Sequence, residues 1–238
     1  MARPGGVVIA SQRFWALART DGTIVEGEMP GLPGFVSRVP ILRGLARLGS
    51  AFAPLATGGG VARRGERGLL GVALVVPVAA AFLSDRLQIM VGLVLVAALL
   101  GWLFRGKTLS LHGAEHRAIS ACEARALVDT WETRARPSRF SRRCGTNFAA
   151  LSLATALLLY ALVPPARDAA WSFPLGIAAL GLTMELWFLI QAAPARAAGI
   201  LLAPGLALQR LTTREPSPEQ TRLALCAVAS VLRRELGP

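Results

Sequence analysis

Four long apolar runs dominate the pattern of hydrophobic and polar positions along this chain. They cover residues 68–84, 87–104, 147–163 and 171–191. Each run has about 17–21 residues, close to the length that a helix needs to cross the hydrocarbon core of a bilayer. The connector around Asp85 is short, so the first two runs should form a helical hairpin. The pattern predicts a mainly α-helical, polytopic membrane protein with about four transmembrane helices.

The first 67 residues contain no such run and indicate a small domain instead. Residues 7–10, 13–19 and 23–25 are typical of short strands, with a turn signal between the last two. They predict an N-terminal β-hairpin. Residues 39–48 predict an amphipathic helix near the membrane surface. The glycines at 58–60 predict a flexible joint.

The C-terminal segment has two features. Residues 199–208 are apolar but short and interrupted by a proline, which favours a re-entrant or interfacial segment over a fifth span. Ser217 and Gln220 have the spacing of a capping box, which predicts the start of a helix with one apolar stripe. The stripe consists of Leu223, Ala227, Val228, Val231 and Leu232. The whole chain then divides into five consecutive segments: 1–67, 68–104, 105–146, 147–191 and 192–238.

Composition and charge support a membrane protein and give its orientation. Hydrophobic residues make up 53% of the chain and charged residues 17%, with a net charge of +12. Nine arginines lie in residues 1–67, eight arginines and Lys107 in residues 105–146, and six arginines after residue 192. With four spans these segments fall on one side, which the positive-inside rule identifies as the cytoplasm. We therefore expect cytoplasmic N- and C-termini, the lipid bilayer as partner, and no binding of nucleic acid.

The central polar segment carries the motif H-x-x-E-H, formed by His112, Glu115 and His116. These are the only two histidines of the chain. Residues four apart share a helix face, so two imidazoles can bind one ion while a neighbouring carboxylate activates water. A helix capped by Ser110 and running on to residue 131 would place Glu123 on the same face. A capped helix start without metal remains the alternative.

Two further residues are candidate ligands. Cys144 follows two arginines and could be a metal ligand, a reactive thiolate or a buried, inert thiol. Glu185 lies within the fourth apolar run, where a carboxylate indicates a functional site or an ion pair inside the bundle. The candidate metal ligands are thus His112, His116, Glu123, Glu185 and Cys144. The expected cofactor is a divalent metal ion, with zinc as the candidate.

The sequence resembles the YqhQ-like bacterial membrane proteins, a family of unknown function that is described as a predicted metal-dependent enzyme. The matching blocks are HGAEH at 112–116, RCGT at 143–146, PILRG at 40–44 and QRLTTREP at 209–216. The resemblance implies a multi-pass protein of the bacterial plasma (inner) membrane and supports the metal site. The chain departs from the family at Ser141, where the family usually has a histidine.

Three functions remain open from the sequence. The first is a metal-dependent hydrolase at the cytoplasmic membrane face, with Glu115 as the catalytic general base. The second is a non-enzymatic scaffold or assembly factor that binds a membrane-protein partner or a second copy of the chain. The third is a transporter that uses Glu185 for proton coupling, although four spans make a small bundle.

Overall fold

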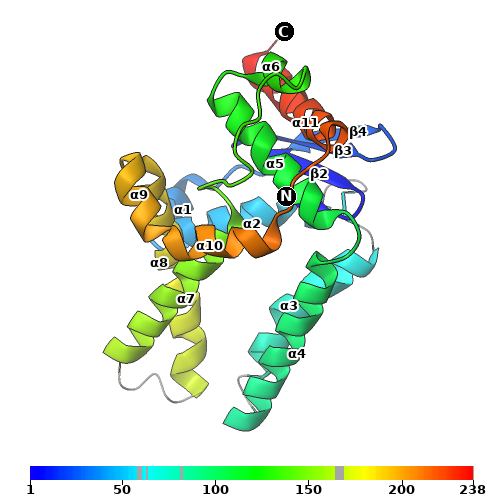
Figure 1. The fold of residues 1–238 in the computed structure, drawn as a ribbon. Coiled ribbons are helices and arrows are strands. Elements are labelled where there is room, and N and C mark those ends of the chain that lie inside the picture. Colours follow the sequence, from blue (N-terminus) through cyan, green and yellow to red (C-terminus); the bar gives the residue numbers. More distant parts are fainter. Residues whose placement is uncertain (58–60, 63, 81–82, 164–168, 238) are drawn as a thin grey trace. The chain divides into compact units, whose positions relative to one another are not determined.

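The computed structural model describes residues 1–57, 61–62, 64–80, 83–163 and 169–237 (Figure 1). The chain folds as two compact units, and each unit is built from segments that are not consecutive in the sequence. The first contains Met1–Gly31, Leu103–Asn147 and Leu202–Pro238, and the second contains Leu32–Trp102 and Phe148–Leu201. The predicted glycine joint at 58–60 and most of the connector between the last two apolar runs lie outside the described residues.

The N-terminal strands of the first unit form an antiparallel sheet with the order β1-β2-β3-β4. The predicted strands are confirmed, and Gly22 adopts φ 85° in the turn between the last two, a backbone conformation that glycine tolerates. The single predicted hairpin is a four-stranded meander, because residues 2–3 add an edge strand. The strands are β1 (Ala2–Arg3), β2 (Gly6–Ala10), β3 (Phe14–Arg19) and β4 (Ile24–Glu28).

Two helices cover this sheet and form the core of the first unit. They are α5 (Thr108–Glu123) and α11 (Pro218–Leu236), which pack on each other and on β2 (Figure 1). The predicted capping box of Ser217 and Gln220 is present. The buried side of α11 includes three residues of the predicted stripe, and α5 contributes mainly alanines, so the two helices approach closely. The buried residues are Val7, Ile9, Ala16, Ala18, Leu111, Ala114, Ala118, Ala121, Ala224, Leu225, Ala227, Val228 and Val231.

The predicted helix over residues 110–131 is wrong in its boundaries. The helix begins at Thr108, and the hydroxyl of Ser110 donates to the Lys107 carbonyl instead of capping the start. It ends at Glu123 because Arg125 takes a left-handed backbone conformation with φ 56°. A short helix α6 (Leu127–Trp131) follows.

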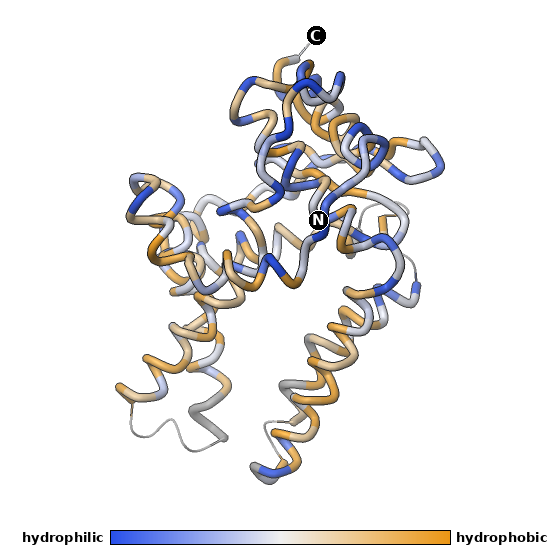
Figure 2. Tube along the Cα trace, in the orientation of Figure 1, coloured by the Kyte–Doolittle hydropathy of each residue, from blue (hydrophilic) through white to orange (hydrophobic). Residues whose placement is uncertain are grey.

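The second unit holds most of the apolar sequence in helices (Figure 2). Among the described residues, two helical stretches are long and apolar enough to cross a membrane, Gly145–Leu162 and Phe173–Ala192, and Arg86–Trp102 is a shorter apolar helix. The chain is therefore mainly helical with an N-terminal antiparallel sheet. The helices that form this unit, wholly or in most of their length, are α1 (Gly34–Arg38), α2 (Leu42–Thr57), α3 (Arg64–Ala80), α4 (Asp85–Leu103), α7 (Gly145–Leu162), α8 (Ala169–Ala192) and α9 (Ala195–Leu201).

The predicted interfacial segment at 199–208 is helical and divided between the two units. Its first residues end α9, and its remainder begins α10 (Ala203–Thr212), which has a proline in its first turn. Proline is tolerated there because its missing N–H would have no helical partner. The break between the helices brings α10 into the first unit, where its buried side faces the candidate site.

Helix α2 packs against α8 through two glycines. A Cβ atom on Gly44 would lie 2.5 Å from the Gly181 carbonyl oxygen, and one on Gly181 would lie 2.4 Å from Ile41 Cγ2. Ile41 itself has φ 68°, a conformation that β-branched residues rarely adopt and that its surroundings must hold. Small residues at a helix crossing let the two backbones approach closely.

Gly44→Ala should destabilise the protein by about 1–3 kcal/mol, because the added methyl group meets backbone atoms that cannot yield. The matched control is Gly49→Ala on the same helix, where an added Cβ meets nothing within 4 Å. That change should be neutral or stabilise by up to about 1 kcal/mol, since alanine favours helix over glycine. Thermal unfolding in detergent measures the stability of both variants. Equal changes in stability would contradict the close contact between α2 and α8 at Gly44.

Candidate metal centre

Three side chains of the first unit gather their ligand atoms in one place. They are His112, His116 and Cys144, with all three ligand atoms within 4.8 Å of one another. The histidines lie one turn apart on α5, and their ring centroids are 4.4 Å apart. Cys144 directly precedes α7, and its Sγ lies 3.3 Å from His112 Nε2. His116 and Cys144 are buried.

Backbone carbonyls orient both imidazoles. His112 Nδ1 lies 2.8 Å from the Thr212 carbonyl oxygen, and His116 Nδ1 lies 2.8 Å from the Arg139 carbonyl oxygen. A carbonyl oxygen only accepts hydrogen bonds, so each Nδ1 carries the proton. Nε2 is then the nitrogen of each ring that is left to bind a metal. This is the arrangement in which metal-binding histidines are held in proteins.

The three groups also tune one another electrostatically. Burial raises the pKa of the Cys144 thiol, but hydrogen bonds and charges of His112 and His116 outweigh it and lower the pKa to about 6. Burial lowers the pKa of His112, but the hydrogen bond to Cys144 and the charge of Glu115 leave it raised. Thr146 also donates to Cys144 Sγ from its amide and its hydroxyl. Cys144 is therefore a thiolate at neutral pH, the form that binds metals.

Glu115 is a largely buried carboxylate beside the histidines. Its Oε1 accepts a hydrogen bond of 2.7 Å from the amino group of Met1. Its Oε2 is buried and has no hydrogen-bond partner among the described residues. Burial raises the pKa of Glu115, but the amino group and the charges of the two histidines outweigh it and lower the pKa. The carboxylate is thus ionised and has one oxygen free to accept a proton.

A buried polar network holds the loop that carries Cys144. Gln209 on α10 is fully buried, and its side chain accepts from the Ser141 amide at 2.9 Å and donates to the Ser141 carbonyl at 2.8 Å. Gln209 also donates to Asn147 Oδ1 at 3.1 Å. Asn147 in turn donates to the carbonyls of Ser141 and Arg142. The network fixes residues 141–147 against α10, which also supplies the Thr212 carbonyl.

The other predicted ligands lie elsewhere. Glu123 is the last residue of α5; its side chain is 52% exposed and pairs with Arg143 at 3.0 Å. Glu185 belongs to the second unit, where Arg43 donates to it from Nε at 3.1 Å and from Nη2. The third ligand atom of the cluster is therefore the sulfur of Cys144. Ser141 takes part in the Gln209 network, so the cluster reaches three ligands without a histidine at that position.

The sequence signalled the motif residues but not the groups that orient them. The carbonyls of Thr212 and Arg139 are backbone atoms, which no residue pattern identifies. Gln209 is the first residue of the family-like block at 209–216, but only its position on the buried side of α10 reveals that it holds the loop.

Comparison with known proteins gives a family without an assigned activity. A family described as "Protein of unknown function (DUF1385)" matches residues 73–234. The "Uncharacterized protein YqhQ" of Bacillus subtilis (strain 168) is 34% identical over 130 residues. That alignment covers 52% of this chain and 40% of the length of the relative. No solved structure matches the chain significantly.

Gln209→Leu should destabilise the protein by about 2 kcal/mol or more, because it leaves the amide and carbonyl of buried Ser141 without their partner. The control is Arg210→Gln, an exposed neighbour on the same helix, which should change stability by less than about 0.5 kcal/mol. Thermal unfolding of the purified variants measures the difference. An unchanged stability of the Gln209→Leu variant would show that the hydrogen-bond network does not hold residues 141–147 in place.

Proposed function

We propose that the chain, which belongs to the DUF1385 family of proteins of unknown function, is a membrane-embedded, metal-dependent hydrolase. The observation that carries the proposal is the convergence of His112, His116 and Cys144, with both imidazoles oriented through Nδ1. A structural role for these side chains would not require the ligand atoms of two imidazoles and one thiol to converge. The buried, unpartnered oxygen of Glu115 adds a proton acceptor beside them.

The ligand set fits zinc in a catalytic arrangement. Two imidazole nitrogens and one thiolate are three protein ligands, which leave a fourth position for water or substrate. For tetrahedral zinc at ordinary bond lengths, neighbouring ligand atoms lie about 3.5 Å apart. The separation of Cys144 Sγ and His112 Nε2 is 3.3 Å. His112, His116 and Cys144 would hold the ion, which when bound would supply a water molecule of lowered pKa.

Glu115 would act as the general base at this site. It is ionised, and its Oε2 has no competing hydrogen bond among the described residues. Oε2 would accept a proton from the attacking water and return it to the leaving group, the usual cycle of a carboxylate in hydrolysis. Thr212 and Arg139 would keep the imidazoles oriented throughout, since their carbonyls hold the Nδ1 protons.

We also propose four transmembrane helices, α3, α4, α7 and α8, in the bacterial plasma membrane with both termini in the cytoplasm. Large apolar side chains of α4 and α7 are more than half exposed, which suits contact with lipid. The arginine-rich segments would all lie in the cytoplasm. Chain continuity supports a site near the membrane surface, because α5 begins soon after α4 ends and Cys144 adjoins α7. The exposed residues include Ile89, Leu93, Val94, Leu153 and Leu157.

A second candidate function is hydrolysis with Cys144 as nucleophile. It is favoured by the lowered pKa of the thiol and by the hydrogen bond to His112, the arrangement that activates cysteine nucleophiles. The presence of a second histidine, His116, near the same sulfur favours metal-dependent hydrolysis instead, because a cysteine nucleophile needs only one histidine. Elemental analysis separates the two, and a protein with neither metal nor thiol-dependent activity would favour the scaffold.

The purified protein should contain about one zinc ion per chain, the occupancy of a single three-ligand site. The double variant His112→Ala/His116→Ala should contain none, and Cys144→Ser should bind the ion more weakly. Glu123→Gln is the matched control on the same helix and should keep the full content, because its side chain pairs with Arg143. Elemental analysis of the detergent-solubilised variants measures all four. An unchanged content in the double variant would exclude this site.

Glu115→Gln should retain the metal and lose hydrolysis by at least about 100-fold, the contribution of a positioned general base. The measurement is a screen of ester, amide and phosphoester substrates with the wild-type protein, followed by rates for the variant. Cys144→Ser with full metal loss but full activity would point away from the metal reaction. Equal rates of hydrolysis for Glu115→Gln and the wild type would exclude Glu115 as the general base.

The proposed topology predicts opposite labelling of two introduced cysteines in intact cells. Ser84→Cys, between α3 and α4, should react with a membrane-impermeant maleimide from outside. Ser138→Cys, in an exposed loop of the first unit, should react only after lysis. Both are placed in a background without Cys122 and Cys226, while Cys144 is buried. The reverse pattern would invert the proposed orientation, and equal labelling would contradict the four spans.

A further inference from the structure

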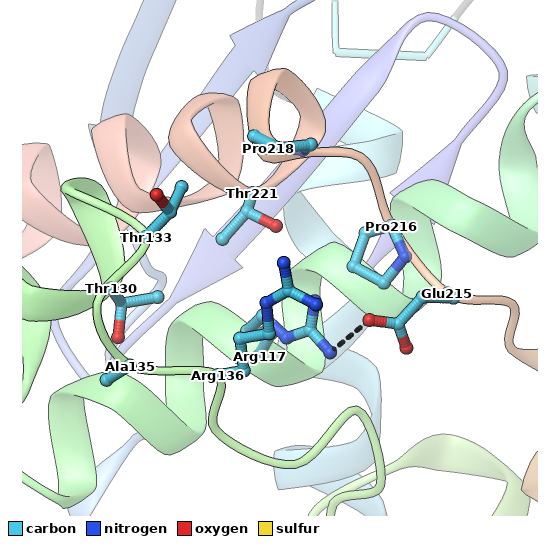
Figure 3. A pocket seen from close by; sticks show the side chains of 9 residues that line it. All are labelled: Arg117, Thr130, Thr133, Ala135, Arg136, Glu215, Pro216, Pro218 and Thr221. Atoms are coloured by element: carbon cyan, nitrogen blue, oxygen red, sulfur yellow. Dashed lines mark hydrogen bonds and ion pairs between the residues drawn. The ribbon is translucent and has the colours of Figure 1, made fainter.

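A small cavity lies in the first unit, and His112, His116 and Cys144 are not among the residues that line it. It has a volume of about 130 Å³ and opens between α5, the segment after α6, and the start of α11 (Figure 3). Pockets for drug-sized ligands are about 300–1,000 Å³, so this one suits a single small group. Its lining residues are Arg117, Thr130, Thr133, Ala135, Arg136, Glu215, Pro216, Pro218 and Thr221.

Two arginines give this cavity a positive character. Arg117 is buried, with 8% of its surface exposed. It donates from Nε to the Pro137 carbonyl and from Nη2 to Glu215 Oε1. Its Nη1 is not one of the buried side-chain atoms that lack a hydrogen-bond partner among the described residues. Arg136 is exposed and has no partner among the same residues. The two guanidiniums together offer more N–H donors than their partners within the chain use.

Glu215 is the one carboxylate that lines the cavity. Its oxygen lies 2.7 Å from Arg117 Nη2, and its side chain is 60% exposed. An exposed side chain of this kind can turn into solvent when an anion takes its place on Arg117. Two guanidiniums against one glutamate leave the cavity with a net positive charge.

The backbone at the cavity is also held in an unusual conformation. Thr133 has φ 63°, a left-handed conformation that is rare for a β-branched residue. Such residues cost free energy and persist where the surroundings fix them, often at ligand sites. In Figure 3, Thr133 and Thr130 lie on the opposite side of the arginines from Glu215. Thr130 and Thr221 are buried at its base, whereas Thr133, Arg136 and Glu215 are exposed, so the cavity is open to solvent.

From these features we infer that the cavity binds a single phosphate group through Arg117 and Arg136. A carboxylate has two oxygens, which one guanidinium can saturate, whereas the oxygens of a tetrahedral phosphate can accept from two guanidiniums at once. The small volume fits a phosphate or a phosphoester headgroup and excludes a nucleotide. This inference is independent of the proposed hydrolase, because none of the lining residues is a candidate metal ligand.

The test is calorimetric titration of the full-length, detergent-solubilised protein with inorganic phosphate and with glycerol 3-phosphate. The background is His112→Ala/His116→Ala, so that phosphate cannot bind to a metal at the other site. Arg136→Gln should weaken phosphate binding by at least about tenfold, since it removes a charge-assisted hydrogen bond. The matched control is Arg134→Gln, two residues away and paired with Asp129 at 2.8 Å, which should change the affinity by less than about twofold.

Tighter binding of inorganic phosphate would identify a free phosphate as ligand, and tighter binding of glycerol 3-phosphate would identify an esterified headgroup; both support the pocket. No saturable binding, equal loss in Arg134→Gln, or an unchanged affinity in Arg136→Gln would overturn it. Binding seen in the wild type but absent from the double-histidine background would also overturn it, because the phosphate would then have bound the metal centre. Phosphate binding in a protein that holds no metal leaves the pocket intact while the hydrolase fails.

Discussion

The candidate site depends on two backbone carbonyls that orient two imidazoles through their Nδ1 atoms. Thr212 and Arg139 each accept a hydrogen bond from a histidine Nδ1, and without them neither Nε2 would be fixed as the ligand atom facing Cys144. These carbonyls come from α10 and from the loop before α7, while the histidines come from α5. The geometry therefore exists only when three distant stretches of sequence are folded together, and the alanine-rich core between α5, α11 and the sheet keeps α5 in place.

Local patterns were sufficient for the elements and for part of the site. Strand alternation, the capping box at Ser217 and the spacing of His112 and His116 each depend on neighbours in sequence, and each is confirmed as structure. Cys144 was one of the candidate ligands, but its contact with His112 was not predictable in this way, because the two residues lie 32 positions apart and meet through tertiary packing. Helical periodicity pointed to Glu123 instead, but the helix ends there. Its end is set by Arg125 at positive φ, without the glycine or asparagine that usually signals such a stop.

Glu185 shows that the role of an ionisable residue in an apolar helix can be assigned only when its interaction partner is known. The sequence allowed a metal ligand, a proton carrier or an ion pair. In the second unit the guanidinium of Arg43 holds the carboxylate with two donors, next to the close contact of Gly44 with Gly181. The pair follows directly from that contact, because the small residues bring α2 near enough for Arg43 to reach α8. An ion pair that fastens an amphipathic helix to an apolar one accounts for Glu185 without metal chemistry, and it weakens the case for proton transport, which needs a carboxylate that can release its partner.

The order of segments along the chain links the site to the apolar helices. The chain leaves the first unit at Gly31, returns at Leu103, leaves again at Asn147 and returns at Leu202, so each pair of apolar helices is tied to the first unit at both ends. Among the three candidate ligands, Cys144 is nearest in sequence to a point where the chain passes between the units, at Asn147. Its position relative to the histidines would follow any movement of α7 if the helix alone held it. Asn147 and Gln209 prevent this, because they fasten residues 141–147 to α10 through buried hydrogen bonds. The thiolate is thus positioned by the core of the first unit and not by α7 alone.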